Sequence, residues 1–110
     1  MSEFVYLYRG GATNGSPEEM QQVTQRWIAW LKGLAEAGHL KDRGLPLQRT
    51  GKVISAADGV IDGPYAESKD IIGGFSIVEA VDIDQAVALT SGCPGFETGG
   101  AVEVRPVMAM

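Results

Sequence analysis

The residues with the greatest capacity for chemistry lie in one short stretch, 62–69, which reads Asp-Gly-Pro-Tyr-Ala-Glu-Ser-Lys. It holds carboxylates and a cation, the groups that proton transfer or the binding of a small carboxylate requires. Asp62, Glu67 and Lys69 are therefore the candidate catalytic residues, and Tyr65 and Lys69 are candidate ligand contacts. A structural role is equally open, because Asp-Gly-Pro favours a tight turn and Glu67 could simply pair with Lys69 or with a second subunit.

A second set of candidates lies in the first and last expected strands, where Tyr6 and Tyr8 could contact a ligand together with Glu103 and Arg105. The forked guanidinium of Arg105 could hold an anion. It could equally neutralise Glu103, or a carboxylate of a second subunit, so both interpretations stay open.

The sequence indicates neither a metal site nor a bound cofactor. With one histidine, His39, and one cysteine, Cys93, it has no ligand spacing typical of a metal centre. Cys93 has no basic neighbour that would activate it, so we expect a packing role. Glycine pairs at 10–11 and 73–74 lack the strand and helix that a phosphate loop needs.

Composition narrows the class of protein. A chain of 110 residues fits a single domain, 1–110, and its net charge of −5 argues against a nucleic-acid partner. No apolar run reaches the roughly 20 residues that cross a bilayer, so we expect no membrane span. The start Met1-Ser2-Glu3 does not resemble a signal peptide, and a single cysteine fits a reducing compartment, which predicts a cytoplasmic protein.

The elements that must position these residues follow from periodicity and turn signals. Residues 4–9 are aromatic and β-branched and predict a strand, and Ser16, Pro17 and Glu19 predict a capped helix start. Apolar residues then recur at helical spacing up to Gly38, with Trp27 and Trp30 in the apolar stripe. The remaining expected elements are short strands at 45–50 and 52–55, a hairpin turn at 57–59 leading into 60–62, a loop at 62–74, a strand at 75–80, a helix capped by Asp82 and stopped by Pro94, and a strand at 101–106.

This order predicts an α+β fold of ferredoxin-like βαββαβ type, an antiparallel sheet with two helices on one face and an extra short strand or arm in the middle. Alternation assigns Val5 and Leu7 to the helix side, and Phe4, Tyr6 and Tyr8 to the open side with Glu103 and Arg105. Such a face is too apolar for water and too polar for a core. We therefore expect a homodimer that packs sheet to sheet around a partly polar cavity.

Two stretches resemble a known family, the YCII-related or DGPF proteins. Residues 62–70, followed by Gly73-Gly74-Phe75, are similar to the DGPF signature, and residues 102–108 are similar to the closing segment of those proteins. The resemblance spans most of the chain and implies a dimeric α+β barrel. Some YCII-like relatives have a His–Asp pair suspected of catalysis, but His39 follows the helix cap and is not assigned to such a pair. Gly92 stands where family members often have an arginine.

Two functions follow as hypotheses. The first is a cofactor-free protein that binds or transforms a small molecule, with an anion as the favoured class, in the cavity between the sheets. The second is a non-catalytic regulatory or interaction module, since members of the family are often encoded near extracytoplasmic-function sigma factors. The residues do not decide whether the protein is an enzyme, and they do not identify a substrate.

Overall fold

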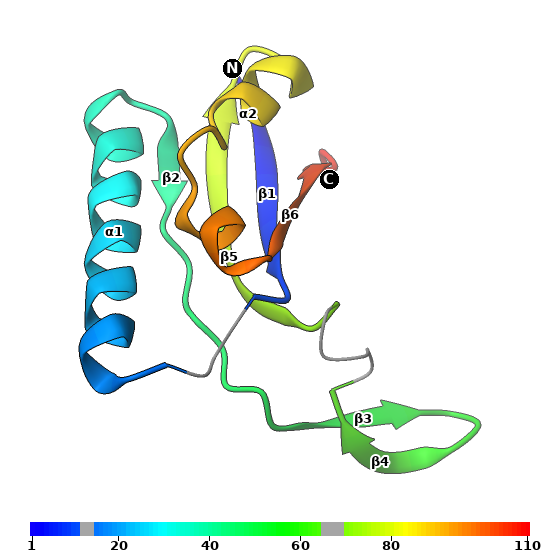
Figure 1. Ribbon diagram of the computed structural model, residues 1–110. Helices are drawn as coiled ribbons and strands as arrows, with labels where there is room; N and C mark the ends of the chain where they lie inside the picture. The colour runs from blue at the N-terminus through cyan, green and yellow to red at the C-terminus, as the bar shows by residue number, and fades with distance from the viewer. Residues whose placement is uncertain (12–14, 65–69) are drawn as a thin grey trace.

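The computed structural model describes residues 1–11, 15–64 and 70–110. In these ranges the chain forms a four-stranded sheet, a separate two-stranded hairpin and two α-helices (Figure 1). None of the helices in the described ranges is long and apolar enough to cross a membrane.

The four-stranded sheet has the ferredoxin-like order. It contains β1 (Ser2–Arg9), β2 (Leu40–Asp42), β5 (Ile72–Ala80) and β6 (Ala101–Pro106), arranged as β2-β5-β1-β6 with every neighbouring pair antiparallel. A helix follows β1 and another follows β5, so the predicted α+β fold is confirmed. The two central strands, β1 and β5, are each followed by a helix that leads to a strand at the edge of the sheet, as the split βαβ arrangement requires.

Both helices begin where the sequence predicts. In α1 (Pro17–Glu36) the Ser16 hydroxyl accepts a hydrogen bond from the Glu19 amide at 3.1 Å, and Gly38 beyond its end takes a left-handed conformation with φ +81°. In α2 (Ile83–Ala88) the Asp82 carboxylate accepts from the Gln85 amide at 2.8 Å. A 3₁₀ helix, η1 (Pro94–Thr98), follows α2 and was not predicted.

The hydrophobic core lies between the helices and one face of the sheet. Tyr6 and Val78 are fully buried at its centre, and Trp30 of α1 packs against them. The predicted placement of the tryptophans in the inward stripe of α1 agrees with this packing: the Tyr6 and Trp30 rings stack with centroids 6.2 Å apart, and the Tyr8 and Trp27 rings meet edge to face at 4.7 Å.

The segment after α1 differs from the prediction. Residues 45–50 do not form a strand, and only Pro46 makes an isolated bridge, to Gly74. The edge strand is instead β2, which has a single apolar residue, Leu40, and therefore gave no strand pattern in the sequence. Gly44 lets the chain pass β5 with φ +69°, where a Cβ would lie 1.7 Å from the carbonyl oxygen of Phe75.

The hairpin formed by β3 (Gly51–Ser55) and β4 (Gly59–Gly63), here called the arm, projects away from the four-stranded sheet (Figure 1). The strand predicted at 52–55 and the turn predicted at 57–59 are both confirmed, and Gly59 has the positive φ that the turn needs. The molecule is thin, with principal extents of 43 × 43 × 18 Å. It therefore has room for one sheet layer and one helix layer.

Candidate functional site

The sheet face opposite the helices has an apolar centre. The register pairs Val5 with Ile77 and Leu7 with Phe75, so these four side chains lie together on β1 and β5. All four are partly exposed, and the core cluster of the described residues includes none of them. We call this surface the open face.

Ionisable residues border the open face along β6 and at the end of β1. Leu7 is paired with Glu103 and Val5 with Arg105, which places both charged residues on this face, as predicted. The Arg9 Nε lies 2.7 Å from the Glu103 carboxylate, and both side chains are more than a quarter exposed. We call Arg9, Glu103 and Arg105 the polar margin.

The two arginines of the polar margin differ in their bonding. Arg9 donates to Glu103 and, through Nη1, to the carbonyl of Asp70 at 2.5 Å, so it ties β6 to the start of β5. Arg105 is exposed, and within the described part of the chain it makes no hydrogen bond or ion pair. A guanidinium with free donors on a partly apolar surface can bind an anion in the bidentate geometry that carboxylates favour.

A third arginine lies near the same end of the sheet. Arg49 donates to the carbonyl of Gly11 at 3.0 Å and to that of Gly10 at 3.4 Å. Sequence reasoning missed Arg9 and Arg49. The signal for Arg9 was available, because it continues the alternation of Val5 and Leu7, whereas Arg49 lies in irregular chain that gives no such pattern.

The placement of Tyr6 and Tyr8 on the open face was wrong. Both point toward the helices: Tyr6 donates a hydrogen bond to the Ala86 carbonyl of α2, and Tyr8 contacts both tryptophans of α1. The same holds for Phe4, which is 4% exposed. Both faces of β1 are apolar, so alternation alone could not tell them apart, and the bulkier set fills the deeper layer under the helices. Tyr6 and Tyr8 are therefore core residues and cannot contact a ligand on the open face.

The buried tyrosines also lack the acidity that chemistry would need. Burial raises the pKa of Tyr6 to about 12, with a smaller contribution from the neighbouring Cys93, and burial likewise raises the pKa of Tyr8. Cys93 is 2% exposed, and burial raises the pKa of its thiol to about 11. The expected packing role of Cys93 agrees with this environment.

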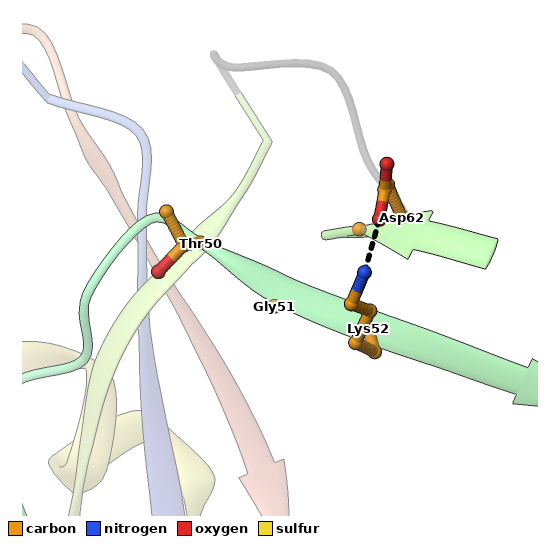
Figure 2. Close-up of a pocket in the computed structure, with 5 residues that line it drawn as sticks. Thr50, Gly51, Lys52 and Asp62 are labelled. Carbon is orange, nitrogen blue, oxygen red and sulfur yellow. Dashed lines mark hydrogen bonds and ion pairs between the residues drawn. The ribbon is translucent and has the colours of Figure 1, made fainter. Parts of the chain in front are cut away.

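Asp62, one of the three candidate catalytic residues, lies on the arm. Its carboxylate pairs with Lys52 across the hairpin, and the two side chains point toward each other in Figure 2. They line a shallow, open depression at the base of the arm with Thr50, Gly51 and Gly63. Among the described residues, Asp62 thus pairs with a side chain on the opposite strand of the hairpin. Tyr65, Glu67 and Lys69 lie outside the described residues.

His39 and Gly92 are the remaining residues singled out in the sequence, and both are notable for their backbone environment. His39 Nδ1 lies 2.7 Å from the carbonyl oxygen of Glu79, where the chain enters β2 beside β5. Gly92 has φ +84°, a left-handed conformation that favours glycine. Among the described residues there is no group of histidine, cysteine and carboxylate side chains that could hold a metal ion.

Comparisons with known proteins agree with this fold. The 5-chloro-2-hydroxyhydroquinone dehydrochlorinase (TftG) of Burkholderia phenoliruptrix AC1100, solved in complex with 2,5-dihydroxybenzoquinone, has a similar structure with a TM-score of 0.50. The match covers 98% of this chain and 95% of that one, at 22% sequence identity. No relative is found among curated proteins. The model of the YCII-related domain matches residues 3–110, almost the whole chain, and the chain belongs to the YCII-related domain family.

Proposed function

We propose that this protein forms a homodimer through its open face and binds or transforms a small anionic molecule between the two sheets, at the polar margin. One observation carries the proposal: an uncovered apolar sheet face and two arginines lie on the same side of the sheet. The apolar part favours a second subunit, and the arginines favour an anion within the cavity that the second subunit closes.

The energy that burial of the open face contributes to sheet-to-sheet association is of the same order as the cost of association. Complete burial of a Val, Leu, Ile or Phe side chain contributes about 1.5–3 kcal/mol. Because the four apolar residues of the open face are already partly shielded, the eight in a dimer contribute on the order of 10 kcal/mol. The loss of translational and rotational freedom costs about 4–15 kcal/mol.

The charge on the polar margin selects the ligand class. Glu103 neutralises Arg9, which leaves Arg105 as the guanidinium available to an anion. A second subunit over the open face would exclude water and strengthen the attraction between Arg105 and an anion. The dehydrochlorinase of similar fold was solved with 2,5-dihydroxybenzoquinone. The hydroxyl groups of that compound are acidic, because the quinone carbonyls stabilise its anion, so it is a suitable first probe.

The segment that resembles the DGPF signature, residues 62–70, is here called the signature loop, and it is proposed to contribute to binding at the polar margin. Asp70, whose carbonyl accepts from Arg9, directly follows Lys69 in the chain. On this basis we retain Tyr65 and Lys69 as proposed ligand contacts and Glu67 as a proposed acid or base.

The test combines mass and binding. Light scattering should give twice the chain mass of 11.7 kDa at micromolar concentration. An NMR titration with 2,5-dihydroxybenzoquinone should shift amides of β1 and β6, and Arg105→Gln should weaken binding by about tenfold, or about 1.4 kcal/mol.

Arg26→Gln is the matched control for the titration. Arg26 is an exposed arginine like Arg105, but it lies on the helix side, where it pairs with Glu97 at 2.9 Å between α1 and η1. A monomer, or an equal loss of binding in both variants, would contradict the proposal.

A further inference from the structure

The arm has more exposed apolar surface than a two-stranded hairpin can keep in water. Ile54 and Val60 are opposite each other in the register and are 77% and 64% exposed. Val53 and Ile61 form the next pair, on the other face, and Ile61 is 46% exposed. Both faces of the arm are therefore apolar, and nothing in the described part of the chain buries the first pair.

A hairpin of this kind is marginal by itself. Two strands without a third strand or a covering layer are barely stable in water, and β-branched residues on a free edge promote association with other chains. The exposed pair Lys52–Asp62 at the base contributes little, since an ion pair in water adds at most about 1 kcal/mol. The stability of the arm therefore requires a surface that is supplied from outside it.

The open face alone is too small for a stable interface. With strands about 4.8 Å apart and about 3.3 Å per residue, a face four strands wide and six residues long covers roughly 400 Å². A standard interface buries about 800 Å² on each partner. One face of the arm, two strands by five residues, adds roughly 160 Å². In a twofold dimer each subunit gives one arm and receives another, so the total rises to roughly 700 Å² per subunit.

We infer that residues 51–63, the arm, pack against a second copy of this chain beside its open face, so that each subunit clasps the other. The inference rests on the homodimer of the proposed function and adds that the arm completes the interface between the two subunits. The occupant is a second copy because the same chain presents both uncovered surfaces, and a twofold axis covers both at once.

The first test introduces charge into the arm. The double variant Ile54→Lys/Val60→Lys should raise the dimer dissociation constant by at least about 100-fold, as measured by analytical ultracentrifugation. Its near-ultraviolet circular dichroism should not change, because these side chains lie outside the aromatic core. Ile28→Lys, at a 57% exposed position on α1, is the matched control and should leave the constant within about twofold of wild type.

A second measurement separates this inference from the sheet-to-sheet dimer. The Ala57→Cys variant, with a nitroxide attached at this position at the tip of the arm, is mixed with ¹⁵N-labelled wild-type chain. The nitroxide should broaden amide signals of the ¹⁵N-labelled subunit. The buried Cys93 should not be labelled. Leu7→Lys tests the open face in the same ultracentrifugation series.

Each outcome has a distinct meaning. Dissociation of the arm variant together with intersubunit broadening supports the clasp. If the arm variant stays dimeric and Leu7→Lys dissociates, the clasp is overturned and the sheet-to-sheet dimer stands. If the arm variant dissociates and Leu7→Lys does not, the arm holds the dimer and the sheet-to-sheet model fails. A monomeric wild type overturns both.

Discussion

The hydroxyl of Tyr8 donates a hydrogen bond to the hydroxyl of Ser76 at 2.9 Å, and Ser76 donates onward to the carbonyl of Arg43 at 2.7 Å. These bonds connect the two central strands of the sheet to the irregular segment that leads to the arm. Ser76 is fully buried and has no access to water, so these two bonds satisfy its hydroxyl.

The hydroxyls of Tyr8 and Ser76 should not contribute equally to the free energy of unfolding, which gives a first prediction. Tyr8→Phe removes one donor but leaves Ser76 bonded to Arg43, so it should lower the free energy of unfolding by about 1 kcal/mol. Ser76→Ala leaves both the Tyr8 hydroxyl and the Arg43 carbonyl without their partner, and it should cost about 2–3 kcal/mol. Urea unfolding of both variants at one protein concentration gives the comparison. A larger loss for Tyr8→Phe would show that the Arg43 bond contributes little.

The buried thiol predicts a loss of stability in alkali. Burial raises the pKa of Cys93 from 9.0 to about 11. Between these values the unfolded chain has released a proton that the folded chain keeps, so the free energy of unfolding falls as pH rises, by up to about 1.4 kcal/mol per pH unit. Tyr6, whose pKa rises from 10.0 to about 12, should extend the decline to higher pH.

The variant Cys93→Ala isolates the contribution of the thiol. It should be somewhat less stable than wild type near neutral pH, because a small cavity replaces the sulfur. Its decline between about pH 8 and about pH 10.5 should nevertheless be smaller, since the contribution of the thiol is absent. Unfolding curves at both pH values measure this difference. Parallel declines in the two proteins would mean that Cys93 ionises as readily in the folded chain as in the unfolded one.

The ion pair on the polar margin predicts a gain of binding. Glu103→Gln removes the negative charge that neutralises Arg9 and leaves two uncompensated guanidinium groups on one face. The affinity for 2,5-dihydroxybenzoquinone should rise about three- to tenfold, and the gain should shrink at high salt. Glu97→Gln, which frees Arg26 on the helix side, should have no effect. Weaker binding by Glu103→Gln would show instead that the carboxylate itself contacts the ligand.

The signature loop predicts that binding and stability respond differently to one substitution. Lys69→Ala should weaken binding of the same probe by about three- to tenfold while the melting temperature changes by no more than about 2 °C, because a cation at the proposed rim of the cavity would have little packing to lose. Lys32→Ala is a suitable control, since Lys32 is an exposed lysine in an ion pair on α1. Unchanged binding by Lys69→Ala would favour a folding role for the Asp-Gly-Pro segment and strengthen the case for a non-catalytic module.

The local elements were largely determined by the sequence, because their signals act over a few residues. Ser16 and Asp82 cap their helices through bonds to amides three residues away, and Gly38 ends α1 with a positive φ. The hairpin turn before Gly59 is equally local. The resemblance in residues 62–75 and 102–108 adds the family, and the strand order then follows from the fold.

Only the tertiary structure decided which face of β1 is buried. Phe4, Tyr6 and Tyr8 alternate with Val5 and Leu7, and period-two alternation gives the same pattern for either assignment. The helices bury the aromatic set because Trp27 and Trp30 pack against Tyr6 and Tyr8, a contact between residues far apart in the chain. The ion pair of Arg9 with Glu103 spans β1 and β6, and β2 depends on pairing with β5 more than on its own residues. Such contacts lie beyond the range of a local pattern, so they become visible only when the chain is folded.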